Sequence, residues 1–132
     1  MDIDIIPEDV YMTVKHVEQN GTIVEYPKYE VNAYGVVRNK ETGEELPISN
    51  RGNSDMMKKV YQRVNFYYEE TISKLLHRVV LSSFNPISQA NSVVNHRDND
   101  ETNNKLSNLE WVTTGYNNLH ATHWHKKYGR NV

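Results

Sequence analysis

The chain has 132 residues, of which 37% are hydrophobic and 24% are charged, and its formal net charge is −2. This length fits a single domain, and the absence of cysteine excludes disulfides and cysteine-ligated zinc and favours a reducing compartment, the cytoplasm. No apolar run approaches the roughly 18 residues that a membrane span needs, and the acidic first residues are unlike a signal peptide, so we expect no membrane partner.

The first half of the chain predicts short antiparallel strands joined by turns. Apolar alternation predicts strands over residues 10–17, 22–26, 29–32, 35–38, 59–67 and 71–74. Turn-forming residues occupy 19–21, 41–44 and 68–70, and the polar segment 48–54 is predicted to be a loop.

The second half predicts a helix, a hairpin and a second helix. Apolar residues at helical spacing predict a helix over 75–84 that ends before Pro86. Segments 93–96 and 109–112 are predicted strands joined by a polar loop, and a helix over about 115–125 should follow. We therefore predict one α+β domain over residues 1–132, with an antiparallel β region in 1–74 and a helix plus strand–strand–helix unit in 75–132.

Charges are unevenly distributed over this layout. Residues 1–25 hold six acidic residues and one basic residue, whereas residues 26–132 hold eleven acidic and fourteen basic residues. The overall charge argues against a nucleic-acid binder, but the larger part carries about +3 before any histidine is protonated. Basic residues cluster at Arg51, Lys58, Lys59 and Arg63, and at Lys126, Lys127 and Arg130. Such clusters fit a solvated surface as well as they fit DNA contact.

The predicted hairpin carries residues suited to phosphodiester hydrolysis. That reaction needs a base for the attacking water, and charge stabilisation at phosphorus and at the leaving oxygen, which one metal ion can supply. Because side chains alternate across a strand, we expect His96 to face the water as the base and Asn95 to face the metal. Asn117, in the first turn of the following helix, would approach the same ion. Two amide oxygens favour Mg²⁺, with Mn²⁺ possible and Zn²⁺ disfavoured.

The segment Val94-Asn95-His96-Arg97-Asp98, followed by Asn108-Leu109-Glu110-Trp111-Val112-Thr113 and then Asn117, resembles the motif of HNH endonucleases. The similarity is to the phage and intron homing group, in the variant with asparagine in place of the last histidine. Residues 29–38 and 77–86 match two further patterns of this group in the same order. The resemblance implies a ββα-metal fold, His96 as general base, Asn95 and Asn117 as metal ligands, and Asn108 as the brace of the loop that carries His96. If the gene is a phage gene, the place of action would be the cytoplasm of a bacterial host.

The chain departs from the group's pattern at two positions. Asn95 stands where the group often has aspartate, which removes a negative charge and should weaken metal binding. Ala121 stands where zinc-type members have a further histidine, which again favours Mg²⁺.

Contacts to DNA are expected from basic residues and histidines on several predicted elements. The candidates are Arg51, Lys58, Lys59 and Arg63 on or beside strand 59–67, together with His77, Arg97 and His120. An ordinary exposed sheet face explains the strand equally well, and His77 also fits a residue that merely begins a helix. Asp98 fits either a bond within the loop or a contact that orients His96, and Trp111 is expected in the core.

These inferences favour a metal-dependent endonuclease that acts on double-stranded DNA, of nicking or homing type. One active site cuts one strand at a time, so double-strand breaks would call for a homodimer. The first alternative is a catalytically weak or inactive DNA-binding module that keeps the fold. The second is an interaction protein whose acidic residues 1–25 bind a basic partner.

Overall fold

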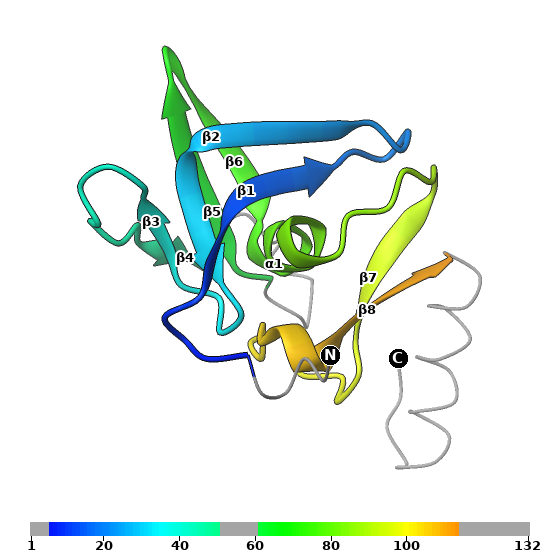
Figure 1. The fold of residues 1–132 in the computed structure, drawn as a ribbon. Coiled ribbons are helices and arrows are strands. Elements are labelled where there is room, and N and C mark those ends of the chain that lie inside the picture. The colour runs from blue at the N-terminus through cyan, green and yellow to red at the C-terminus, as the bar shows by residue number, and fades with distance from the viewer. Residues whose placement is uncertain (1–5, 51–60, 114–132) are drawn as a thin grey trace.

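The structure is a computed structural model that describes residues 6–50 and 61–113. Its elements in chain order are β1 (Tyr11–Val17), β2 (Ile23–Asn32), β3 (Val37–Asn39), β4 (Ile48–Ser49), β5 (Arg63–Tyr68), β6 (Glu70–Leu75), α1 (Leu76–Phe84), β7 (Ser92–His96), the 3₁₀ turn η2 (Leu106–Asn108) and β8 (Leu109–Thr113). The described strands form three antiparallel sheets, ordered β1-β2-β3, β4-β5-β6 and β7-β8 (Figure 1). Among these residues no helix is long and apolar enough to cross a membrane.

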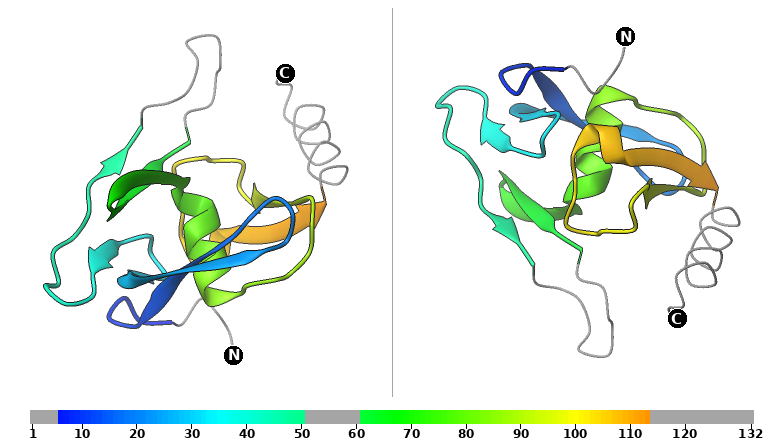
Figure 2. Two further views of the ribbon diagram at one scale, coloured as in Figure 1. Left: turned by 90° about the horizontal axis from the view of Figure 1, so that it is seen from above. Right: turned by 90° about the horizontal axis from the view of Figure 1, so that it is seen from below.

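Helix α1 lies where the three sheets meet. In Figure 1 it is seen end-on, with β1 and β2 on one side and the β7–β8 hairpin on another, and both views of Figure 2 keep it between them. Val79 and Val80 are fully buried, and Leu76 and Leu81 are nearly so. A helix that is apolar on more than one face is stable only when neighbours cover it from several sides. The catalytic candidates on β7 are therefore held against a rigid centre.

Two serines of α1 complete the hydrogen bonding of β1. The hydroxyl oxygen of Ser82 accepts a bond from the backbone N–H of Val17 at 3.0 Å, and that of Ser83 accepts one from Lys15 at 2.9 Å. Both serines are buried, so these bonds satisfy strand groups that would otherwise be desolvated without a partner. They fix β1 along the helix.

Tyrosines join the first sheet to the second. The ring of Phe66 on β5 stacks on Tyr26 at 5.0 Å and contacts Tyr29 at 4.9 Å, both on β2. The hydroxyl of Tyr29 accepts a bond from the backbone N–H of Tyr67, and that of Tyr68 accepts one from Lys28. These rings supply buried apolar area while the hydroxyls of Tyr29 and Tyr68 stay paired, which is how a chain of low hydropathy builds a core.

The predicted α+β fold is confirmed, with three local differences. The segments predicted as separate strands over 22–26 and 29–32 form the single strand β2, and the register of β1 against it shifts between Thr13 and Val14. Ile48 and Ser49, predicted to be in a loop, pair with β5 as β4, and the strand predicted from residue 59 begins at Arg63 within the described residues. The helix predicted over 115–125 lies outside the described residues.

A turn glycine supports the contact between the β1–β2 hairpin and the segment after α1. Gly21 has a φ of +91°, and a Cβ placed there would lie 3.0 Å from the backbone nitrogen of Ala90 and 3.1 Å from the carbonyl carbon of Gln89. Gly43 also has a positive φ, +75°, but a Cβ there meets nothing within 4 Å.

We predict that Gly43→Ala lowers the free energy of unfolding by about 1 kcal/mol, the cost of left-handed backbone for alanine. Gly21→Ala should cost about 1–3 kcal/mol more, because backbone rather than a flexible side chain opposes the added carbon. Urea unfolding of the two variants measures the difference. Equal costs would mean that the close approach of the two segments does not constrain the fold.

Candidate active site

The β7–β8 hairpin places the motif residues in a defined register. Asn95 lies opposite Glu110, and His96 lies opposite Leu109. Directly opposite residues of an antiparallel pair share a face, so Asn95 and Glu110 point to one side and His96 to the other. The predicted separation of roles between Asn95 and His96 thus has a geometric basis.

Asn108 holds the loop between the two strands. Its side-chain nitrogen donates to Oδ1 of Asp98 at 2.9 Å and to the carbonyl of Asn103 at 2.8 Å, and its oxygen accepts from the backbone N–H of Asp98 at 3.1 Å. The backbone oxygen of Asn108 accepts from the N–H of Arg97 at 2.8 Å. The buried Asn108 therefore fixes the chain directly after His96.

Asp98 bonds within this loop. Besides Asn108, its carboxylate accepts from the backbone N–H of Asp100 at 2.9 Å and from the side chain of Asn103 at 2.8 Å. Burial raises the pKa of Asp98, but the bonds from Asn103, Asp100 and Asn108 outweigh it and leave that pKa below its ordinary value. These bonds answer the question left open by the sequence in favour of a loop contact.

His96 is buried and contacts polar and aromatic groups. It is 7% exposed, and its Nε2 lies 2.8 Å from Oδ1 of Asn104, whose Nδ2 donates to Oε1 of Gln62 at 2.7 Å. The ring of His77 stands edge-on at 5.0 Å, and that of Tyr61 lies at 6.1 Å. The imidazole is held by its surroundings rather than by its own strand alone.

Asn95 contacts a carboxylate across the hairpin. Its Nδ2 donates to Oε2 of Glu110 at 3.3 Å, which leaves the amide oxygen as the atom to ligate a cation. Hard oxygen donors of this kind fit Mg²⁺ or Mn²⁺. The described residues contain no group of three or more His, Cys, Asp or Glu side chains that would hold a metal ion, so the donor set there does not fit a zinc cage.

The expected DNA contacts differ in how they are placed. Arg97 is exposed, whereas Arg63 is half-buried and donates from Nε to the hydroxyl of Ser73 at 2.9 Å. His77 is only 7% exposed, and its Nδ1 is buried with no hydrogen-bond partner among the described residues, so this placement disfavours the expected contact with DNA. The remaining predicted site residues, Asn117, Arg51, Lys58, Lys59 and His120, lie outside the described residues.

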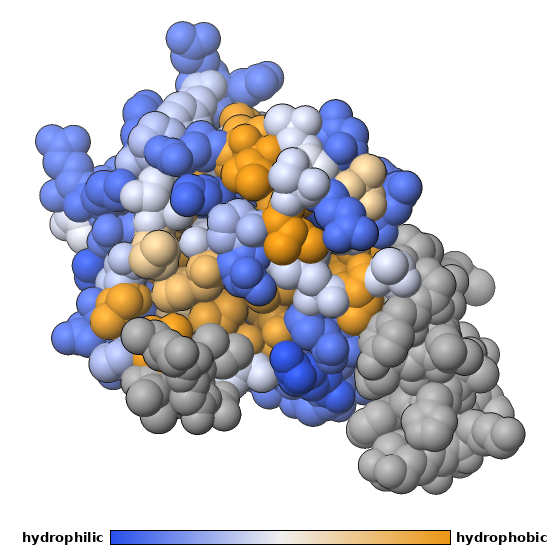
Figure 3. Space-filling view, turned by 45° about the vertical axis from the view of Figure 1, so that its right-hand side comes forward, coloured by the Kyte–Doolittle hydropathy of each residue, from blue (hydrophilic) through white to orange (hydrophobic). Residues whose placement is uncertain are grey.

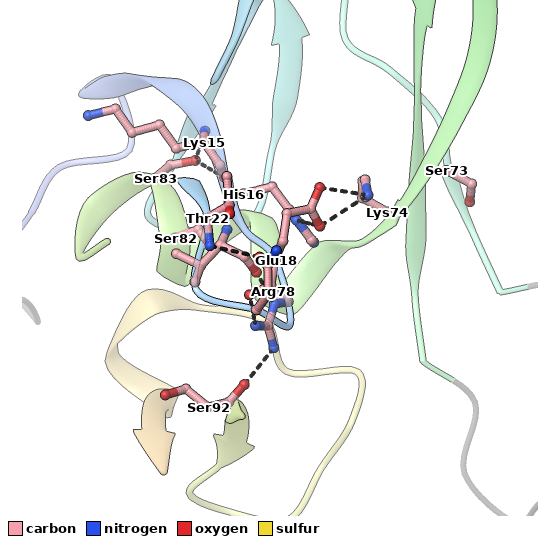
Figure 4. A network of polar contacts seen from close by, with 12 residues as sticks. Lys15, His16, Glu18, Thr22, Ser73, Lys74, Arg78, Ser82, Ser83 and Ser92 are labelled. Atoms are coloured by element: carbon pink, nitrogen blue, oxygen red, sulfur yellow. Dashed lines mark hydrogen bonds and ion pairs between the residues drawn. The ribbon is translucent and has the colours of Figure 1, made fainter. Parts of the chain in front are cut away.

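A second polar network ties the hairpin to the N-terminal sheet. The guanidinium of Arg78 donates to the carbonyls of Val17, Glu18 and Ser92, and Figure 4 shows it between these segments. Lys74 and His16 both pair with the carboxylate of Glu18. Arg78 thereby connects β1 to the start of β7 through the helix that carries it. The sequence placed Arg78 inside a motif but gave it no role.

A hollow of the described structure lies beside the hairpin. It has a volume of about 830 Å³ and an apolar lining of residues that precede β1 or belong to β1, α1 and β8, among them Val10, Met12, Leu81, Phe84, Leu109 and Trp111. Figure 3 shows how apolar side chains also gather in patches on one face of the molecule. Trp111 packs against the core from the edge of this hollow, and its Nε1 donates to the carbonyl of Asn85 at 2.7 Å. Arg97 and Glu110 are polar members of its lining, whereas His96 and Asn95 do not line it.

Two side chains beside His96 were missed as site residues. Asn104 lay without a role in the polar loop predicted between the two strands, and Gln62 lay in a predicted strand. The adjacent asparagines Asn103 and Asn104 were a usable signal, because two amides in one short loop need two different partners.

Comparisons with known proteins agree with this geometry. Residues 74–119 match the family model described as HNH endonuclease. Two uncharacterized HNH endonucleases of Acanthamoeba polyphaga mimivirus are 36% and 32% identical to the chain over 98 and 97 residues, which is 73% of this chain in both cases. The chain spans only 23% and 27% of the length of these two relatives.

One solved structure, titled "DNA binding and cleavage by the HNH homing endonuclease I-HmuI", has the same fold. It matches with a TM-score of 0.64 and 23% identity over 92% of this chain and 62% of that chain. Residues 74–119 therefore match the HNH endonuclease family, as the motif predicted.

Buried histidines should make the stability of the fold depend on pH. Burial first, and then the charges of His96 and Arg78, lower the pKa of His77 from 6.5 to about 3. At pH values between these two, His77 is protonated in the unfolded chain and neutral in the folded chain. The free energy of unfolding therefore falls as the pH drops from 6.5 toward 3. His16, whose pKa is lowered to about 4, acts in the same direction.

We predict that His77→Phe makes the fall in unfolding free energy below pH 6.5 shallower, because one of the two histidines with a lowered pKa no longer takes up a proton on unfolding. Urea unfolding at a series of pH values gives the slope. Arg97→Gln is the control and should keep the wild-type slope, since Arg97 is exposed. An unchanged slope in His77→Phe would contradict a neutral buried His77.

Proposed function

We propose that this chain is a metal-dependent DNA endonuclease that hydrolyses phosphodiester bonds in duplex DNA. The observation that carries the proposal is the buried His96, held by Asn104 at the end of β7, beside Asn95 and its partner Glu110. This pair stands in the segment that matches the HNH endonuclease family. DNA binding and cleavage by the structural neighbour I-HmuI support DNA as the substrate class.

In this proposal His96 accepts a proton from the water that attacks phosphorus. Asn95 and Asn117 would hold the divalent ion, which stabilises charge at phosphorus and at the leaving oxygen when bound. Asn108 acts as a positioning residue, because its bonds to Asp98 and Asn103 fix the loop that follows His96. A single histidine and a single ion are enough to cut one strand.

Mg²⁺ is the proposed ion, with Mn²⁺ able to replace it and Zn²⁺ disfavoured. Asn95 carries no charge, so the ligand itself contributes only a dipole to the binding of a hard cation. The carboxylate of Glu110, 3.3 Å from the Asn95 amide nitrogen, supplies negative charge close by. We expect the ion to bind weakly without DNA, because substrate phosphate would complete its ligands.

The binding of DNA would rest on phosphate contacts from basic residues. Arg63 and Arg97 are the described candidates, and Arg51, Lys58, Lys59 and His120 complete the proposed set. Affinity should fall steeply with salt, as it does whenever cations on a protein displace counterions from DNA. Nicking by one chain, double-strand cleavage by a homodimer and action in the cytoplasm belong to the same proposal.

One observation favours an alternative function. The neutral Asn95 in the position of the metal ligand weakens any ion site, and a chain that binds no ion would remain a DNA-binding module with this fold. Both functions include the binding of DNA, but only the endonuclease cleaves it.

We predict that the purified chain nicks supercoiled plasmid with Mg²⁺ and with Mn²⁺ and that EDTA abolishes nicking. His96→Ala should lower the rate on the order of 10²- to 10⁴-fold, the usual contribution of a general base, while DNA binding persists. His16→Gln is a matched control, because it replaces another buried histidine outside the hairpin and should keep activity.

The outcome against the endonuclease is salt-sensitive DNA binding without strand cleavage under any of these metals. That result would establish the binding module. Cleavage that survives in His96→Ala would instead remove His96 from the role of base.

A further inference from the structure

We infer that Asn104 is a positioning residue that fixes the tautomer of His96, so that Nε2 carries the proton and Nδ1 is the nitrogen that acts as base. The inference deepens the proposed function and rests on it for the role of His96 as the general base. The tautomer itself is a property of the resting protein that exists whether or not DNA is cut.

The contact is short and shielded from water. Nε2 of His96 lies 2.8 Å from Oδ1 of Asn104, and the two residues are 7% and 5% exposed. A hydrogen bond in such surroundings competes little with solvent and is costly to leave unmade. One tautomer should therefore predominate rather than a mixture.

The side-chain amide of Gln62 fixes the orientation of the Asn104 amide. Nδ2 of Asn104 donates to Oε1 of Gln62 at 2.7 Å, so its oxygen is the atom left to meet His96. The backbone oxygen of Gln62 accepts from the N–H of Leu76 at 2.9 Å, which holds Gln62 at the start of α1. To reverse the bond to His96, both amides would have to turn together, because otherwise two amide oxygens would face each other.

An oxygen acceptor at Nε2 has a direct chemical consequence. A neutral imidazole has one nitrogen that donates and one that accepts, and only the accepting nitrogen can take a proton from water. With Nε2 donating to Asn104, the accepting nitrogen is Nδ1. In the opposite tautomer the basic nitrogen would be Nε2, which faces Asn104 in the interior of the protein.

The rings around His96 support the same orientation. His77 stands edge-on at 5.0 Å, and the Tyr61 ring lies 5.5 Å from His77 and 6.1 Å from His96. Burial keeps the pKa of His77 at about 3, so at neutral pH no second cation stands beside the imidazolium that forms when His96 takes a proton. The neighbours restrict rotation of the ring without opposing its charge.

The side chains of the adjacent asparagines Asn103 and Asn104 bond different partners. The side chain of Asn103 bonds Asp98 and is part of the loop brace, whereas that of Asn104 bonds His96 and Gln62. Asn103→Leu is therefore a matched control for Asn104→Leu, one position away in the same loop.

The test uses the full chain with ¹⁵N-labelled histidine and records the two ring nitrogens of His96 by NMR, assigned by their loss in His96→Gln. We expect a protonated Nε2 and an unprotonated Nδ1 in the wild type and in Asn103→Leu. Asn104→Asp keeps an acceptor oxygen and should show the same tautomer at a pH where His96 is neutral. Asn104→Leu should show both tautomers. These measurements need no DNA and no metal.

Single-turnover plasmid cleavage provides the second readout. Asn104→Leu should lower the rate at saturating protein about 10- to 100-fold, the usual cost of losing a partner that orients a functional imidazole. Its affinity for DNA should stay that of the wild type, and Asn104→Asp should recover most of the rate. A merely structural role would weaken binding and rate together and leave the tautomer unchanged.

A proton on Nδ1 in the wild type overturns the inference, as does an unchanged tautomer in folded Asn104→Leu. If Asn104→Leu does not fold, the wild type and Asn104→Asp still decide the tautomer. A wild type that has the expected tautomer but cuts no DNA refutes the endonuclease and leaves the hydrogen bond established.

Discussion

The burial of α1 is the constraint on which the rest of the structure depends. A nine-residue helix is too short to be stable alone, so it persists because the three sheets cover it. That burial makes unpaired polar groups on the helix costly, and several of them have partners, although Nδ1 of His77 has none among the described residues. The hydroxyls of Ser82 and Ser83 bond β1, and the guanidinium of Arg78 bonds the carbonyls of Val17, Glu18 and Ser92. The bonds of Arg78 thus hold the β7–β8 hairpin against the N-terminal sheet, and those of the two serines hold β1 against the helix.

The hairpin itself uses buried amides where a larger protein would use apolar packing. Asn95, Asn104 and Asn108 are each buried, and each directs its side chain to a different partner: Glu110, His96 and Asp98. An amide offers both a donor and an acceptor, so its partners define its orientation. Preorganised polar groups of this kind cost little reorganisation when charge develops in a reaction. The same loop therefore serves the fold and the proposed chemistry.

Much of this arrangement follows from sequence, and the exceptions have physical causes. Helical spacing of Leu76, Val79 and Val80 located α1, because local periodicity reports a buried face directly. The pairing of Ile48 and Ser49 with β5 was missed, since a two-residue strand is defined by its partner and not by its own pattern.

The same distinction holds at the site. The motif located His96, Asn95 and Asn108, and it predicted that Asn108 braces the loop. It did not indicate that Gln62, more than 40 positions from Asn104 in the chain, reaches the residue that contacts the base. Nor did it predict the burial of His77, which depends on how α1 meets β7 and the residues before β5. Contacts between distant segments have no local signature.

If one divalent ion binds at Asn95 beside His96, a paramagnetic ion will reveal its position. Substoichiometric Mn²⁺ is added to the uniformly ¹⁵N-labelled chain with a DNA duplex, and the NMR signals that broaden are mapped. We expect early broadening at Asn95, His96 and Glu110, and its loss in Asn95→Leu. Broadening confined to the acidic loop residues Asp100 and Glu101, with Asn95 unaffected, would contradict it.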